Sequence, residues 1–505
     1  MIKLIYRIES DYMSKKRMLI VTSVTLSVVT ISLGIVKLYQ TYALSNYIGT
    51  VTDTGIDVYI NDDSYASIPA NGSSNVYYML TNTNPGTVKY GVAYQTTSGV
   101  TVKVYDTSED PATGTIEEND KKYIKLHLEN KNSTNKTIEL STVLGYENGG
   151  DLVVPSGVTL VTDTYTPPPT AAEYITKLYT TASKTTVTNN SITYNTAPSV
   201  SLMNDRLGGT TTDLDGGNIR YYGASPNNYI YFNCSDYSNQ TSSTCETWRI
   251  IGVFDGKLKL IRGSQIGTYS WDNKDTSTGA ESNFGKNDWT TARLMKLLNP
   301  SDYYTTDSND NNLGQGLYYN SASGKCYSGQ NNATVDCNFT STGIKNDITR
   351  NMIAETTYNL GGWNSNTVYP NLMYEKERGT TVYTGRPTTP WTGKIALAYT
   401  SDYGYAADLN QCKDKTLYDY NNSTCTSNNW MKAIITNNGS NSGWLLTPYC
   451  STSSNVWYVY PVGNVYFNYP VYSAFGAVPV LSLSSELGIE SGGDGSSSNP
   501  YKLSA

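Results

Sequence analysis

The sequence predicts a multidomain chain with three parts: one membrane-spanning helix, an all-β module and a larger α+β domain with long loops. Three observations predict it. Residues 18–36 carry no charged side chain, residues 46–165 consist of short β-rich segments separated by turn residues, and residues 171–505 hold all seven cysteines. At 505 residues the chain is long enough for more than one domain with its own core.

The N-terminal region predicts a membrane anchor. Lys15, Lys16 and Arg17 precede the uncharged run at 18–36, which is long enough to cross a bilayer. Positive charge before the span favours a cytoplasmic tail at 1–17, an anchor at 18–38 and an exported remainder. The segment Thr41-Tyr42-Ala43 offers cleavage as an alternative, but the apolar run exceeds a usual signal-peptide core.

The charge balance and the tyrosine content of the chain indicate which kinds of partner to expect. Charged residues make up 16% of the chain, with 36 basic against 43 acidic, so we expect no nucleic-acid partner. The chain has 45 tyrosines and six phenylalanines. Tyrosine is frequent on binding surfaces because its ring is apolar and its hydroxyl is polar. An A/T-rich genome would also raise the tyrosine content.

Residues 46–165 predict an all-β stalk module. Its pattern resembles an immunoglobulin-like β-sandwich, and a small barrel is the alternative. The module contains His127, the only histidine of the chain, which we interpret as an ordinary strand residue. A catalytic triad with histidine and a histidine-rich zinc site are therefore not expected. The predicted strands are Val76–Leu80, Thr87–Tyr94, Thr101–Tyr105, Tyr123–Leu128 and Thr137–Leu144.

A proline linker at 166–170 leads to the domain at 171–505. Residues 247–254 and 257–262 predict a hairpin around Asp255-Gly256. Helical spacing is found in four segments. They are 171–182, 288–298 with Asp288 as N-cap, 344–357 and 428–435.

Six cysteines fall into sequential pairs separated by 11, 11 and 13 positions. In an exported chain this spacing predicts three local disulfides, and it lacks the short gaps of a zinc knuckle. Cys450 is left over. The expected pairs are Cys234–Cys245, Cys326–Cys337 and Cys412–Cys425.

Residues 444–483 form the candidate recognition segment. Gly463-Asn464 between two valines predicts a two-residue hairpin turn, with strands at 456–462 and from Val465 onward. Apolar alternation supplies a scaffold there, while Tyr, Asn and Ser supply exposed tips. This combination favours a recognition surface over a reaction centre.

An ordered set of motifs resembles an uncharacterised bacterial surface-protein family. The motifs include TWRIIGVF, SWDN, DWTTARLMKLLNP, WTGKIALAYTSDYGYA, WLLTP and GAVPVLSLSSEL, and the resemblance covers about residues 215–505. It implies a C-type-lectin-like domain, in the broad sense shared with formylglycine-generating enzymes. Two helices would lie beside a twisted antiparallel sheet whose final strands present a variable binding face. It also implies a single-pass protein of the bacterial plasma membrane with its C-terminus at the cell surface.

The chain departs from the patterns of these relatives. Gly476-Ala477-Val478-Pro479 lacks the arginine common in the closing strand, and Trp271-Asp272-Asn273 stands without the proline tripeptide of calcium-dependent lectins. The acidic segment 307–312 lacks the glycine and the final carboxylate of a calcium loop. We therefore expect no metal and no cofactor.

The preferred function is non-catalytic, adhesin-like binding of an extracellular glycan or protein. Alternation along strands predicts that about half of the candidate residues point inward. One alternative is an extracellular enzyme using Cys450 with a second thiol, or Glu375, Glu377 and Asp402; another is a passive envelope protein. The candidate ligand-binding residues are Trp457, Tyr458, Tyr460, Asn464, Tyr466, Asn468, Tyr469 and Tyr472.

Overall fold

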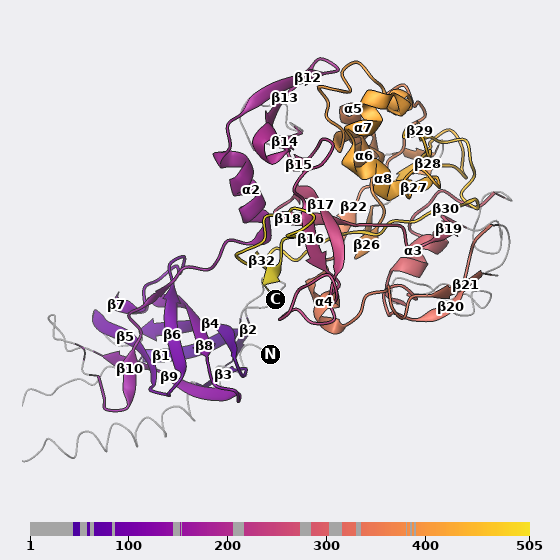
Figure 1. Cartoon of the computed structure of the whole chain (residues 1–505). Helices are drawn as coiled ribbons and strands as arrows, with labels where there is room; N and C mark the ends of the chain where they lie inside the picture. The colour runs from indigo at the N-terminus through magenta and orange to yellow at the C-terminus, as the bar shows by residue number, and fades with distance from the viewer. Residues whose placement is uncertain are drawn as a thin grey trace, which may run out of the picture. The chain divides into compact units, whose positions relative to one another are not determined.

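The computed structural model divides into two compact units, Met1–Thr166 and Pro167–Ala505 (Figure 1). Within the described part of the chain, no helix is both long and apolar enough to cross a membrane. The expected cytoplasmic tail and anchor at 1–38 lie outside the described residues. These are 44–50, 58–60, 65–82, 86–144, 152, 154–205, 217–272, 284–301, 316–329, 335–379, 381–383, 386–387 and 390–504.

The first unit consists of two β-sheets. One has the order β11-β6-β8-β4-β1-β2, and the other has the order β10-β5-β9-β3 with β7 also paired to β5. Tyr78 and Leu80 of the first sheet and Val92 of the second belong to one apolar core. The strands are β1 Leu44–Thr50, β2 Val58–Ile60, β3 Tyr65–Ile68, β4 Gly72–Asn82, β5 Val88–Gln95, β6 Val100–Tyr105, β7 Thr113–Ile116, β8 Lys121–Asn130, β9 Lys136–Leu144, β10 Val158–Leu160 and β11 Thr164–Tyr165.

All five strands predicted for this unit are present, as β4, β5, β6, β8 and β9. His127 lies in β8 and is buried. Its ring stacks on Tyr165 with centroids 3.6 Å apart, and its Nδ1 lies 2.8 Å from Asn75 Oδ1. Burial is the main cause that lowers the pKa of His127, partly offset by Glu129.

The second unit is built on two larger sheets. The first contains nine strands, in the order β12-β13-β14-β15-β17-β18-β31-β26 with β16 paired to β17. The second has the order β19-β30-β27-β28-β29. Their strands are β12 Thr185–Asn189, β13 Ile192–Ala197, β14 Leu202–Asn204, β15 Ile219–Tyr221, β16 Tyr229–Phe232, β17 Glu246–Phe254, β18 Lys257–Arg262, β19 Thr268–Ser270, β26 Ile395–Ala396, β27 Gly443–Pro448, β28 Val456–Val459, β29 Val465–Tyr466, β30 Ala474–Gly476 and β31 Val480–Ser482.

Short elements complete the second unit. The pairs β20–β21, β22–β25, β23–β24 and β32–β33 form separate two-stranded sheets. Their bounds are β20 Ser323–Cys326, β21 Val335–Asn338, β22 Thr356–Tyr358, β23 Thr381–Tyr383, β24 Arg386–Pro387, β25 Trp391–Gly393, β32 Gly488–Ile489 and β33 Leu503–Ser504. The helices are α2 Ala171–Thr181, 3₁₀ helix η1 Pro198–Val200, α3 Arg293–Leu298, α4 Asp347–Met352, α5 Pro370–Glu377, α6 Thr400–Tyr405, 3₁₀ helix η4 Leu417–Asn421, α7 Ser423–Ser427 and α8 Trp430–Ile435.

The described chain is therefore mostly β-sheet, with several sheets and few helices, and the second unit contains three short helices that were not predicted, α5, α6 and α7. The β17–β18 hairpin is confirmed, with Asp255 at φ 48° and Gly256 at φ 72° in its turn. These positive angles are those of a primed hairpin turn. The helix predicted at 171–182 is also confirmed, and it starts at a capping box formed by Thr170 and Glu173.

Two predicted helices are shorter than expected. The first begins at Arg293 and not at Asp288, because Arg293 N and Leu294 N donate to Asp272 Oδ1 and Trp271 O and not to the preceding turn. The second covers only Asp347–Met352, with Asn346 as its N-cap. The helix predicted at 428–435 occurs as α8, two residues shorter at its start.

The three predicted disulfides are present: Cys234–Cys245, Cys326–Cys337 and Cys412–Cys425. Cys450 is a free, half-buried thiol. The Cys412–Cys425 bridge closes a segment that contains η4. Because β29 contacts η4, this segment lies beside the hairpin of the candidate recognition surface.

Candidate ligand-binding face

The β28–β29 hairpin is confirmed, but its turn is wider than the predicted two residues. Strand β28 ends at Val459, and strand β29 begins at Val465. In the connection, Tyr460 N donates to Asn464 O and Gly463 N donates to Tyr460 O, each over 2.8 Å. Gly463 has φ 109°, which few other residues adopt without strain.

Three of the predicted ligand-binding residues are buried and do not reach the surface. Trp457, Tyr458 and Asn464 are 0%, 1% and 2% exposed. Side chains do alternate along β28, but neither face of the strand is exposed, because each face packs in a core. Trp457 packs in a core with Leu417 and other residues from the helical segments, and Tyr458 packs in the other core.

The other candidates lie at or near the surface. Tyr460 and Tyr469 are 42% and 45% exposed, Asn468 is exposed, and Tyr466 and Tyr472 are half-buried. The Asn468 side-chain oxygen accepts a hydrogen bond from the Tyr458 hydroxyl. The buried tyrosine therefore fixes an exposed amide.

The structure adds Tyr418 of η4, which sequence reasoning missed. Its side chain is 38% exposed, its ring centroid lies 5.3 Å from that of Tyr466, and the two hydroxyls are 3.3 Å apart. The one available signal was its place inside the segment closed by Cys412–Cys425. We define the tyrosine face as Tyr418, Tyr460, Tyr466, Asn468 and Tyr469.

Ring contacts join the tyrosine face into one surface. The Tyr466 ring lies 5.8 Å from that of Tyr460 and 6.4 Å from that of the buried Tyr458. Tyr458 in turn lies 5.8 Å from Tyr469. The hydrogen bond with Tyr466 is the main cause that raises the pKa of Tyr418 above its usual value.

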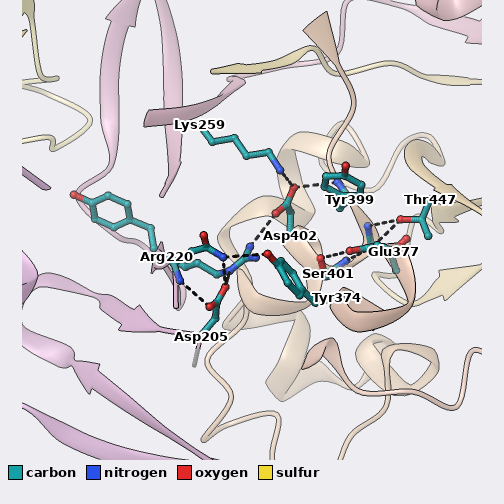
Figure 2. A network of polar contacts seen from close by, with 12 residues as sticks. Asp205, Arg220, Lys259, Tyr374, Glu377, Tyr399, Ser401, Asp402 and Thr447 are labelled. Carbon is teal, nitrogen blue, oxygen red and sulfur yellow. Dashed lines mark hydrogen bonds and ion pairs between the residues drawn. The ribbon is translucent and has the colours of Figure 1, made fainter. Parts of the chain in front are cut away.

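A buried network of charged groups connects α5 and α6 to neighbouring strands of the second unit (Figure 2). Arg220 donates from Nε to Asp205 over 2.6 Å and from Nη1 to Asp402 over 2.9 Å. The second carboxylate oxygen of Asp402 accepts from Lys259. Burial by itself would raise the pKa of Asp402, but Lys259 and Arg220 together hold it below its usual value.

Glu377 forms the second half of the network. Its carboxylate accepts from Ser401 N over 3.0 Å, from Ser401 Oγ over 2.5 Å and from Thr447 Oγ1 over 2.8 Å. Glu377 is fully buried, and burial raises its pKa above the usual value despite these donors. The network connects β15 and the end of β14 with β18, α5, α6 and β27 (Figure 2). This arrangement indicates a structural role, because it holds these elements together.

Two of the three carboxylates considered for catalysis, Glu377 and Asp402, belong to this buried network. Asp402 is 2% exposed, and both of its oxygens accept from protein cations. The exposed Glu375 side chain pairs with Lys376. For the free thiol, burial raises the pKa of Cys450, which favours the less nucleophilic protonated form.

Within the described ranges, no group of three His, Cys, Asp or Glu side chains is placed to hold a metal ion. The acidic segment 307–312 lies outside those ranges. Comparison with known proteins gives two findings. No protein-family model matches the sequence, and no curated protein is significantly similar to it.

Proposed function

We propose that this chain is a membrane-anchored bacterial surface protein whose second unit binds an extracellular glycan through the tyrosine face. The observation that carries the proposal is the gathering of Tyr418, Tyr460 and Tyr469, each more than a third exposed, around Tyr466 and the buried Tyr458. Exposed aromatic groups gathered in this way are a mark of interaction sites.

The chemistry of the face favours a glycan. Its side chains are uncharged and combine aromatic rings with hydroxyl and amide groups. Pyranose rings have apolar C–H faces that pack on tyrosine, and hydroxyl groups that exchange hydrogen bonds with phenols and amides. A protein ligand is the second expectation of the sequence, and the test below distinguishes the two.

The proposed fold assignments are consistent with this role. The two sheets of the first unit share one core, as in an immunoglobulin-like sandwich that serves as a stalk. In the second unit, helices lie beside mainly antiparallel sheets, and the β28–β29 hairpin near the end of the chain contributes Tyr460 and Tyr466 to the tyrosine face, which supports the C-type-lectin-like assignment. Membrane attachment rests on the uncharged run at 18–36.

A glycan array and a protein array, each probed with the purified protein, test the proposal. We expect binding to neutral polysaccharides, and we expect Tyr469→Ala to weaken it about tenfold, equivalent to about 1.4 kcal/mol. Tyr65→Ala is the matched control, because Tyr65 is 51% exposed but lies in the first unit. Binding that is equally strong in Tyr469→Ala, or binding to protein probes only, would contradict the proposal.

A further inference from the structure

The turn at 460–464 places two members of the tyrosine face. Tyr460 opens it and Tyr466 follows it, so its conformation sets the distance between their rings. The turn packs against the helical segments: a Cβ atom on Gly463 would lie 2.7 Å from Thr426 Cγ2 and 3.2 Å from Tyr420 O. The face therefore depends on how this turn is held from below.

Tyr403 holds the turn from the interior. Its hydroxyl donates a hydrogen bond of 2.5 Å to the carbonyl oxygen of Gly463, and its side chain is fully buried. Burial raises the pKa of Tyr403 well above its usual value, so the hydroxyl remains a donor at any physiological pH. A buried carbonyl that loses its donor costs free energy, and the turn would then favour other conformations.

Tyr403 is itself fixed, because α6 is tied to three parts of the unit by consecutive side chains. Ser401 binds Glu377 of α5, and Asp402 binds Arg220 and Lys259 of the nine-stranded sheet. Tyr403 binds the turn. The short helix α6 therefore connects the buried charged network, through Asp402, to the surface turn, through Tyr403.

We infer that Tyr403 is a positioning residue for the tyrosine face: its hydroxyl selects the turn conformation in which Tyr460 and Tyr466 are arranged for the ligand. This inference rests on the proposed binding function. It assigns a binding role to a residue that touches no ligand. It also gives the buried network a role in recognition, because the network fixes the helix that carries Tyr403.

The test compares Tyr403→Phe with Tyr420→Phe in the full chain. Tyr420 is a matched control, because it is equally buried, its ring lies 6.2 Å from that of Tyr403, and its hydroxyl donates to Gly404 O and not to the turn. Hydrogen exchange by mass spectrometry, on peptides covering 457–466, reads the turn directly. We expect exchange there to be about fivefold faster in Tyr403→Phe, as for the loss of one buried hydrogen bond, and unchanged in Tyr420→Phe.

Affinity for the neutral polysaccharide identified on the array is the second readout. We expect Tyr403→Phe to weaken it about fivefold while Tyr420→Phe leaves it unchanged. Unchanged exchange in Tyr403→Phe, or equal effects of the two variants, would overturn the inference whether or not a glycan binds. Faster exchange together with wild-type affinity would also overturn it. Faster exchange in a protein that binds no probe would support the positioning of the turn and count against the glycan proposal alone.

Discussion

Lys259 and Asp402 form an ion pair in the interior of the second unit although 143 positions separate them in the sequence. Arg220 shares the same carboxylate, so three charges from two strands and one helix are buried together. A charge left unpaired in such a site costs several kcal/mol, which makes the pair a sensitive point of this fold.

Asp402→Asn is therefore expected to lower the free energy of unfolding of the second unit by about 3–5 kcal/mol. The substitution leaves Lys259 and Arg220 without their shared counter-charge. Urea unfolding followed by tryptophan fluorescence measures the loss. Lys325→Met is the control, because its ion pair with Asp336 is exposed and should contribute less than about 1 kcal/mol. A loss below that value for Asp402→Asn would show that the buried pair is not critical.

Glu377 gives the stability of the protein a specific dependence on pH. Because burial raises its pKa above the usual value of 4.5, the folded state retains a proton that the unfolded state has released. The contribution of Glu377 is therefore fully present below pH 4.5 and is lost as the pH rises through the higher folded pKa. We expect Glu377→Gln to remove this decline.

Unfolding free energies measured between pH 4 and pH 8 test this expectation. Thr447→Val is the control, since it removes a hydrogen bond to the same carboxylate but keeps the titrating group and hence the decline. If Glu377→Gln and the wild type have parallel profiles, Glu377 does not titrate as we describe.

Trp457 and Tyr469 are expected to respond in opposite ways to truncation, although both were candidates for ligand contact. Trp457→Ala should cost about 3–5 kcal/mol of stability, because the side chain is fully buried. Tyr469→Ala should cost no more than about 1 kcal/mol while weakening glycan binding. Thermal unfolding and binding measured on both variants distinguish core from face. Equal destabilisation would place Tyr469 in the core.

The Cys412–Cys425 disulfide is expected to contribute about 3 kcal/mol, as for other loops of similar length. The double variant Cys412→Ala/Cys425→Ala should also weaken glycan binding, because the closed segment carries Tyr418. Thermal unfolding and the array measure the two effects. Cys450→Ala is the control, since its thiol is free and half-buried. A double variant with wild-type stability and binding would contradict this account.

Sequence reasoning performed best where the signal was local. The Asp255-Gly256 turn, the helix predicted at 171–182 and the three cysteine pairs each depend on residues that are close together in the sequence. It was less accurate for the helix expected from Asp288, because Arg293 N and Leu294 N donate to the distant residues Asp272 and Trp271. It was also wrong for Trp457, because alternation indicates two faces of a strand but not whether both are covered.

The sequence by itself determined five strands of the first unit, two hairpins and the three disulfides, because these follow from turn chemistry and short loop closure. Only the tertiary structure decided which aromatic side chains form a face. Tyr418 reaches Tyr466 across 48 positions, and Tyr403 reaches Gly463 across 60. Such contacts depend on how helices and sheets pack, and a local sequence pattern does not predict contacts between residues so far apart in the sequence. The same reason places Asp205, Arg220, Lys259 and Asp402 in one network only after folding.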